Sequence, residues 1–268
     1  WFTIAGINLQ PSEFAKPLFA VVSAWLLTLW REGPDFPGWI YSSALMALIV
    51  GILVLQPDIG MTLMVVLTWG FQMFLAGMPM LLVIFIVALA PLGLVVAYFT
   101  LGHVHKRINQ FWEGGAWQVE KARDSFANGG LFGVGPGDGT VKHHLPDAHS
   151  DFIFAVAGEE FGALACLTLL TLYAFIVLRG FSRAMSDEGL FCLIASASLL
   201  LQFGVQAAIH MASSVHLIPT KGMTLPLISY GGSSLVASGL TMGLILALTR
   251  RRAPYVLPGR RNLQEASS

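Results

Sequence analysis

Long apolar runs separated by short polar breaks dominate the chain. Seven runs approach the length of about 20 residues that an α-helix needs to cross a bilayer, at residues 11–30, 39–56, 58–77, 79–99, 151–178, 189–213 and 225–249. The breaks between them are sharp, such as Arg31 to Asp35 and Gln56-Pro57-Asp58. The pattern predicts an all-α fold, a polytopic transmembrane helix bundle in which residues 1–268 form a single integral membrane domain.

Residues 100–150 break this pattern, because they are polar and rich in glycine. They predict a large loop outside the bilayer. Its segment 129–139 contains six glycines and is reminiscent of a phosphate-binding loop. The segment lacks both the Gly-Lys-Ser/Thr ending and a strand–turn–helix setting, which excludes a nucleotide-binding fold. We expect a loop whose backbone can approach a substrate closely.

Basic residues in short loops predict the orientation, because they are enriched on the cytoplasmic side. The tail, residues 250–268, holds five arginines and is predicted to be cytoplasmic, and Arg31, Arg179 and Arg183 fall on the same side. Counting spans then makes 100–150 an extracytoplasmic loop. The active face is therefore predicted to be extracytoplasmic, where no ATP is available and any chemistry must use an activated substrate.

Composition supports the membrane prediction and narrows the function. Only 11% of the 268 residues are charged and 55% are hydrophobic, whereas soluble domains average about 25% charged residues. The formal net charge is zero, so no basic field indicates nucleic acid as a partner. The two cysteines lie in apolar runs, which predicts no disulfide framework.

The chain begins at Trp1 and shows no signal-peptide pattern. We therefore expect an N-terminally truncated sequence.

Charged residues inside apolar spans cost about 2.5–3.5 kcal/mol each on insertion scales, so each needs a reason. Glu13 and Lys16 are three residues apart, which places them on one helix face where they can pair. A neutralised pair that fixes helix packing is the first interpretation, and a direct substrate role is the second.

Three acidic residues flank the start of the span at 151–178. Asp151 is expected at the mouth of the membrane, and Glu159 and Glu160 about 12 Å further along the helix. Adjacent residues point about 100° apart on a helix, so at least one glutamate is expected to face a polar cavity. A helix N-cap is a second role for Asp151.

Polar side chains also recur along the span at 189–213. Gln202, Gln206 and His210 are four residues apart and form a stripe on one helix face. Such a stripe either joins helices by hydrogen bonds or lines a cavity. His143, His144 and His149 match no strong zinc pattern, and no metal ligand is predicted.

Four sequence blocks resemble the SEDS family, which includes FtsW, RodA and SpoVE. They are Gln10-Pro11-Ser12-Glu13 with Lys16, the turn at 56–60, the block at 145–162 and the block at 219–234. The resemblance covers nearly the whole chain in order, and the Lys221 form of the last block is typical of the FtsW branch or its sporulation relative. Family members have ten spans, so the seven found here imply that three preceding spans are missing.

The resemblance implies a peptidoglycan glycosyltransferase that polymerises lipid II during septal cell-wall synthesis and releases polyprenyl pyrophosphate. The family's essential carboxylate maps to Asp151, the expected general base, and Ser150 replaces the usual threonine before it. Two other positions depart from the family pattern: Lys121 replaces a glutamine, and His210 replaces a frequent asparagine.

The expected site residues divide into two groups. Those predicted to bind substrate are Lys106, Arg107, Gln118, His149, Ser150, Glu159, Glu160, Lys221, Ser229 and Ser233. Those predicted to be structural are Glu13, Lys16, Gln56, Asp58 and Gln206. Lys106, Arg107 and Lys221 are expected to contact the pyrophosphate, and a divalent cation, Mg²⁺ or Mn²⁺, could share that task.

The resemblance also implies partners and a location. A class B penicillin-binding protein transpeptidase and other divisome membrane proteins are the expected partners, at the division septum of the inner (cytoplasmic) membrane. Two other functions stay open. A lipid II flippase would use Glu13, Lys16, Gln206 and His210 along a translocation path, and a non-catalytic divisome scaffold would use none of this chemistry.

Overall fold

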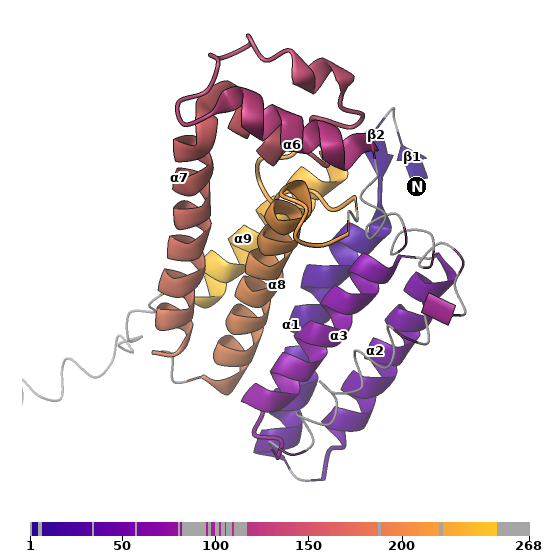
Figure 1. The fold of residues 1–268 in the computed structure, drawn as a ribbon. Coiled ribbons are helices and arrows are strands. Elements are labelled where there is room, and N and C mark those ends of the chain that lie inside the picture. The colour runs from indigo at the N-terminus through magenta and orange to yellow at the C-terminus, as the bar shows by residue number, and fades with distance from the viewer. Residues whose placement is uncertain are drawn as a thin grey trace, which may run out of the picture.

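The computed structural model describes residues 2–4, 7–33, 35–56, 58–79, 81, 95, 98, 99, 102, 105, 109, 117–186, 189–219 and 222–250. Six apolar helices run roughly side by side as a bundle (Figure 1). They are α1 (Pro11–Glu32), α2 (Gly38–Leu55), α3 (Ile59–Leu75), α7 (Ile153–Ala184), α8 (Leu190–Ser214) and α9 (Gly232–Leu248). The predicted polytopic helical bundle is confirmed, and the protein is a multi-pass membrane protein.

Four of these helices, α1, α2, α7 and α8, are long and apolar enough to cross a bilayer, and α3 and α9 are shorter apolar helices of 17 residues. The fourth predicted span, 79–99, lies largely outside the described residues. A short antiparallel hairpin, β1 (Phe2–Ile4) with β2 (Ile7–Leu9), is an exception to the all-α prediction.

Local sequence explains where the helices begin. Pro11 occupies the first turn of α1, where its missing N–H costs nothing, and Glu13 follows in the same turn, near the positive end of the helix dipole. Asp58 caps α3, because its Oδ1 accepts a hydrogen bond from the Met61 backbone N–H at 3.0 Å.

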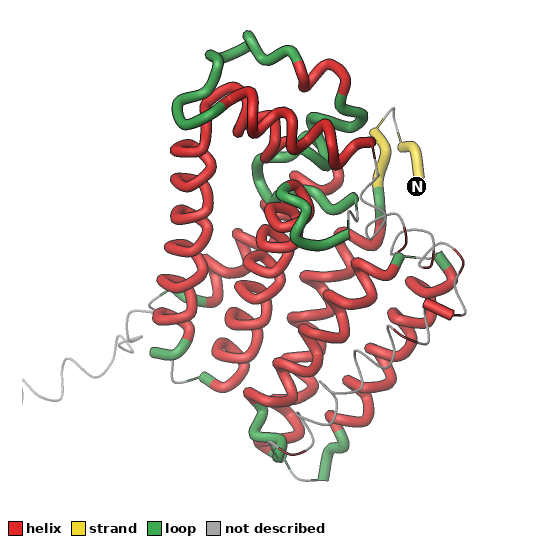
Figure 2. Tube along the Cα trace, in the orientation of Figure 1, coloured by secondary structure: helices red, strands yellow, loops and turns green. Residues whose placement is uncertain are grey.

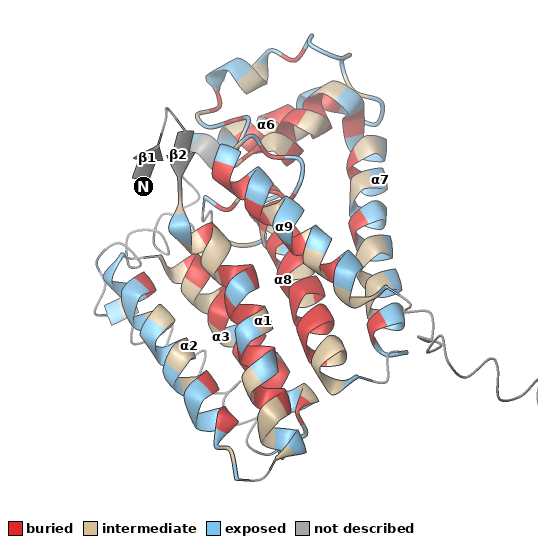
Figure 3. Ribbon diagram, turned by 180° about the vertical axis from the view of Figure 1, so that it is seen from behind, coloured by how far each residue is buried: buried red, intermediate tan, exposed pale blue. Residues whose placement is uncertain are grey.

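Helix α8 is the centre of the bundle and contacts α1, α3, α7 and α9. Its side chains Ile194, Leu199 and Leu200 are almost fully buried. In contrast, most of α2 and the long second part of α7 are exposed and apolar (Figure 3). An apolar helix surface without protein neighbours is typical of a lipid-facing position.

The loop predicted at 100–150 has structure of its own. It contains α6 (Trp117–Gly129) and the short 3-10 helix η1 (Val141–His144), which lie across one end of the bundle (Figures 1 and 2). The last predicted span began too early, because α9 starts only at Gly232. Residues 222–231 are irregular: Pro226 cannot donate a backbone hydrogen bond, and the Leu225 N–H donates to the Ser229 hydroxyl at 2.7 Å.

Candidate functional site

Two segments far apart in sequence meet at the end of the bundle that carries α6. The segment before α7, 145–152, bonds to the segment before α9, 222–231. The Ser229 hydroxyl donates to the Ser150 carbonyl at 2.7 Å, and the Tyr230 N–H donates to the His149 carbonyl at 2.9 Å. The two longest family-like blocks of the sequence therefore form one junction between loops, here called the loop junction.

Asp151 lies in the loop junction and is partly exposed. The first residue outside helix α7 is Phe152, so Asp151 is not the N-cap residue. Gly222 has a left-handed backbone (φ 62°), and a Cβ built on it would lie 3.1 Å from Asp151 Oδ2. The left-handed backbone and the close carboxylate both favour glycine at position 222. The sequence prediction did not single out Gly222, although it directly follows Lys221 in the last block.

Glu159 has a different environment from the one predicted. Its carboxylate is fully buried and accepts four hydrogen bonds, from the Asn128 amide (2.9 Å) and from the backbone N–H groups of Thr140, Val141 and Lys142 (2.8, 2.8 and 2.9 Å). Because these donors use the acceptor positions of the carboxylate, Glu159 holds η1 in place against α7. Its substrate-binding role stays a prediction that this geometry does not favour.

Glu160 forms an ion pair with Lys142, and Lys142 Nζ also donates to the Gly137 carbonyl at 3.0 Å. The expectation that at least one of the two glutamates faces a polar cavity is not met by Glu159, and Glu160 instead pairs with Lys142 of the 137–142 loop. Lys142 was missed because its partner lies 18 residues further along the chain.

Helix α7 is broken at Gly162, which has φ 78° and ψ −179°. A break within an apolar span leaves backbone groups without helical partners. Residues 130–135 supply those partners. The carbonyls of Glu159 and Glu160 accept from the N–H groups of Val134 and Gly135, at 3.0 and 3.1 Å. The N–H groups of Ala163 and Leu164 donate to the carbonyls of Gly130 and Leu131, at 2.9 and 3.3 Å.

The glycines of this segment thus serve close backbone packing within the protein. A Cβ at Gly133 would come within 2.2 Å of the Glu160 carbonyl oxygen, and one at Gly129 within 2.0 Å of the Gly158 carbonyl oxygen. The close backbone approach predicted for the loop is real, but its partner is the break in α7.

We expect Glu159→Gln to lower the free energy of unfolding by about 1–3 kcal/mol, the cost of an unsatisfied buried donor. The side-chain NH₂ group of the new glutamine would face the backbone N–H of Lys142, which now donates to Glu159 Oε2. Thermal unfolding of the purified protein measures the change. Glu160→Gln is the matched control, because Glu160 is partly exposed and has one ion-pair partner; an equal loss in both variants would contradict the role of Glu159 in holding η1.

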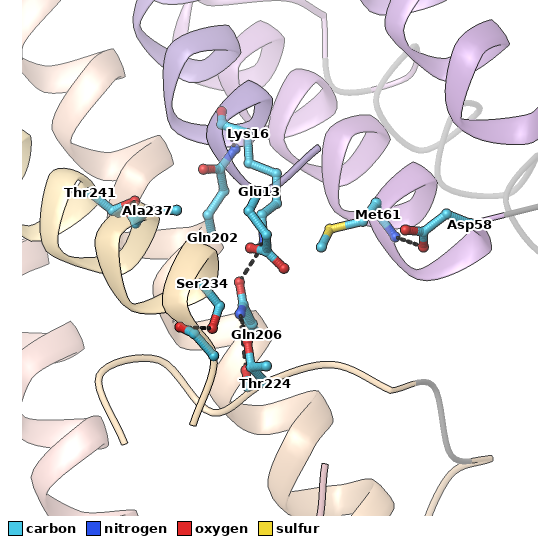
Figure 4. A network of polar contacts seen from close by, with 11 residues as sticks. Glu13, Lys16, Asp58, Met61, Gln202, Gln206, Thr224, Ser234, Ala237 and Thr241 are labelled. Carbon is cyan, nitrogen blue, oxygen red and sulfur yellow. Dashed lines mark hydrogen bonds and ion pairs between the residues drawn. The ribbon is translucent and has the colours of Figure 1, made fainter. Parts of the chain in front are cut away.

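A second polar cluster lies deeper in the bundle, between α1, α8 and α9 (Figure 4). The pair predicted from its spacing is present: Lys16 Nζ lies 2.8 Å from Glu13 Oε2, and both side chains are buried. Lys16 Nζ also donates to Gln206 Oε1 at 2.7 Å. Gln202 Nε2 donates to the Lys16 carbonyl and to the Thr68 hydroxyl, both at 3.1 Å.

The polar stripe of α8 both joins elements and lines a cavity. Gln206 Nε2 donates to the Thr224 carbonyl at 3.0 Å, and His210 Nδ1 lies 2.7 Å from the Met223 carbonyl oxygen. Gln202 and Gln206 also line a pocket. The other residues that line this pocket are Glu13, Lys16, Pro17, Phe203, Pro226, Ala237, Ser238 and Thr241.

The remaining predicted residues differ in their exposure. Ser229 and Ser233 are buried, His149 is exposed, and Gln56 is exposed at the end of α2. Lys121 pairs with Asp124 at 2.9 Å on the surface of α6, and this hydrogen bond raises the pKa of the Lys121 ammonium group. An exposed pair of this kind contributes little to stability.

Three predicted pyrophosphate contacts, Lys106, Arg107 and Lys221, lie outside the described residues, as does the side chain of Gln118. Among the residues that are described, no group of three or more His, Cys, Asp or Glu side chains is arranged to hold a metal ion.

Fold and site together define a class: a polytopic helical membrane protein in which the loops before α7 and α9 present a carboxylate at one end of the bundle. A family model described as cell cycle protein (FtsW, RodA and SpoVE) matches residues 1–253. The chain therefore belongs to the FtsW/RodA/SpoVE family, the SEDS family indicated by its sequence blocks.

Individual relatives agree with this assignment. The chain is 42% identical over 255 residues to the probable peptidoglycan glycosyltransferase FtsW of Caulobacter vibrioides, covering 94% of this chain and 65% of that protein. It is similar to a chain in a solved peptidoglycan synthase complex that coordinates polymerization and crosslinking (TM-score 0.75, 28% identity, 93% of this chain and 72% of that chain). It also resembles the rod shape determining protein RodA of Thermus thermophilus, with a TM-score of 0.62 and 28% sequence identity. This similarity covers 94% of this chain and 70% of RodA. The chain thus spans roughly two thirds of the length of these relatives.

Proposed function

We propose that the protein is a peptidoglycan glycosyltransferase that polymerises lipid II at the outer face of the membrane, with Asp151 as general base. The observation that carries the proposal is the partly exposed Asp151 carboxylate at the loop junction, directly before α7 and against Gly222. Membership of the family and the names of the relatives support the reaction class.

In the proposed reaction, a sugar hydroxyl of the acceptor lipid II attacks the anomeric carbon of the donor. A new C–O bond forms while the bond between that carbon and the pyrophosphate oxygen breaks. Polyprenyl pyrophosphate leaves with the bonding electrons, and Asp151 takes the hydroxyl proton. A base at the end of a membrane-spanning helix suits this substrate, because the pyrophosphate of a membrane lipid lies at the level of the headgroups.

The departing pyrophosphate needs positive charge. Lys106, Arg107 and Lys221 are proposed for this contact from the sequence resemblance, and a Mg²⁺ or Mn²⁺ ion would share the neutralisation of the pyrophosphate. The basic residues of the 250–268 tail support a cytoplasmic tail and hence an extracytoplasmic site. The solved synthase complex supports a crosslinking partner, for which a class B penicillin-binding protein at the division septum is proposed.

A flippase is the second candidate, because four polar or charged side chains, Glu13, Lys16, Gln202 and Gln206, line a pocket within the bundle. Within the cluster, however, Lys16 is bound to both Glu13 and Gln206. A path for a charged headgroup would have to break these contacts.

Purified full-length protein incubated with fluorescent lipid II tests the proposal. We expect glycan strands longer than a dimer, resolved by gel electrophoresis. In parallel, vesicles that hold the protein and carry labelled lipid II in one leaflet report translocation through a membrane-impermeant quencher. Translocation without any polymer would replace the glycosyltransferase with the flippase.

A further inference from the structure

Residues 222–225 form irregular backbone between α8 and α9, and of their carbonyls only that of Leu225 accepts a turn-type backbone bond, from the Ser229 N–H at 3.0 Å and the Ile228 N–H at 3.2 Å, in the described part of the chain. Two consecutive carbonyls of this segment are held by side chains of one neighbouring helix. His210 Nδ1 lies 2.7 Å from the Met223 oxygen, and Gln206 Nε2 lies 3.0 Å from the Thr224 oxygen. His210 and Gln206 are four residues apart and so lie on one face of α8.

This segment forms one wall beside the Asp151 carboxylate, because Gly222 directly precedes Met223. A Cβ on Gly222 would lie 3.1 Å from Asp151 Oδ2, so a small movement of the segment changes the space around the carboxylate. On the other side, Ser229 joins Leu225 to the residue before Asp151, through bonds of 2.7 Å to the Leu225 N–H and the Ser150 carbonyl. Residues 222–225 are therefore held on one side by α8, through Met223 and Thr224, and on the other by Ser229, through Leu225.

We infer that Gln206 and His210 are positioning residues, which hold residues 222–225 in the place that sets the geometry of Asp151. This inference rests on the proposed function of Asp151. Neither side chain needs to touch substrate for this role, and both are buried.

The orientation of both side chains is determined by their partners. A carbonyl oxygen can only accept, so His210 carries its hydrogen on Nδ1. Its Nε2 atom is buried and finds no hydrogen-bond partner in the described part of the chain. For Gln206, the Lys16 ammonium donates to Oε1 at 2.7 Å, which directs the NH₂ group to Thr224. The buried Glu13–Lys16 pair is thus connected to the loop junction through one amide group (Figure 4).

Steady-state polymerisation of lipid II by variants of the full-length protein tests the inference. His210→Leu introduces an apolar side chain of similar size and removes the donor. We expect a decrease in kcat of about 10- to 100-fold with a change in KM of less than about twofold, because a displacement of about 1 Å in catalytic groups can cost 10²-fold.

His210→Asn is the conservative variant, because the side-chain nitrogen of asparagine occupies the same δ position as the donor atom. We expect it to restore kcat to within about threefold of the unsubstituted protein, since a neutral hydrogen bond contributes about 1 kcal/mol and is regained. Ser198→Ala is the matched control on α8, because the bond that the described residues offer to the Ser198 hydroxyl is the one to the Ile194 carbonyl of its own helix. It should leave kcat unchanged.

The positioning role of His210 and the base role of Asp151 are tested by different variants, so either can fail without the other. Normal kcat in His210→Leu, or equal losses in His210→Leu and His210→Asn, would overturn the positioning role. Asp151→Asn is assayed alongside, and full activity of that variant would remove the proposed base instead. Should His210→Leu not fold, Gln206→Met provides the same test through the Thr224 carbonyl, with the same expected loss of kcat.

Discussion

Replacing Asp151 with asparagine is expected to slow glycan polymerisation by about 10²–10⁴-fold, the contribution of a well-placed general base. Asparagine has nearly the same shape, so it fits against Gly222 as the aspartate does. Its amide group cannot take the proton of the attacking hydroxyl. The measurement is the rate of lipid II polymerisation by purified protein, with thermal unfolding to verify that the variant is folded.

Asp147→Asn is the matched control for this experiment. Asp147 lies in the same segment, and its main-chain carbonyl accepts the Ser150 and Asp151 N–H groups at 3.0 and 2.9 Å, a role that the substitution leaves intact. We expect its activity to stay close to that of the unsubstituted protein. A folded Asp151→Asn variant with undiminished polymer output would refute the base assignment. Undiminished polymer together with failed cell division would indicate a scaffold.

Replacing Lys16 with methionine is expected to lower the free energy of unfolding by about 3–5 kcal/mol, the usual cost of removing one partner from a buried ion pair. Glu13 is only 6% exposed and would keep a charge without a counter-ion. Gln206 Oε1 would lose its donor as well. Thermal or denaturant-induced unfolding of the protein in lipid nanodiscs measures the loss of stability.

The double variant Glu13→Gln with Lys16→Met separates the pair from general packing. With both charges removed, most of the lost stability should return, because replacing a whole buried pair is often neutral. A double variant as unstable as Lys16→Met alone would show that the ion pair is not the source of the effect. Thr241→Ala, which lines the same pocket from α9, controls for changes in the pocket itself.

Contacts that are local in sequence were predictable because they depend on helix periodicity. Hydrophobic runs gave the position of the helices, and a separation of three residues gave the Glu13–Lys16 pair. The same reasoning did not predict the surroundings of Glu159 and Glu160, which it placed on a regular helix with at least one of them facing a polar cavity. The helix breaks at Gly162, and residues 140–142 of the preceding loop bond to both side chains.

The sequence by itself determined a membrane-embedded helical protein, its family, and Asp151 as the carboxylate of interest. These conclusions follow from hydropathy and from motif blocks, which both consist of residues that are consecutive in the sequence. Only the tertiary structure decided what surrounds that carboxylate: Gly222 against it, Ser229 joined to Ser150, and the donors of α8 that hold the loop. Such contacts join residues distant along the chain, and they form only when packing of the helices brings their loops together.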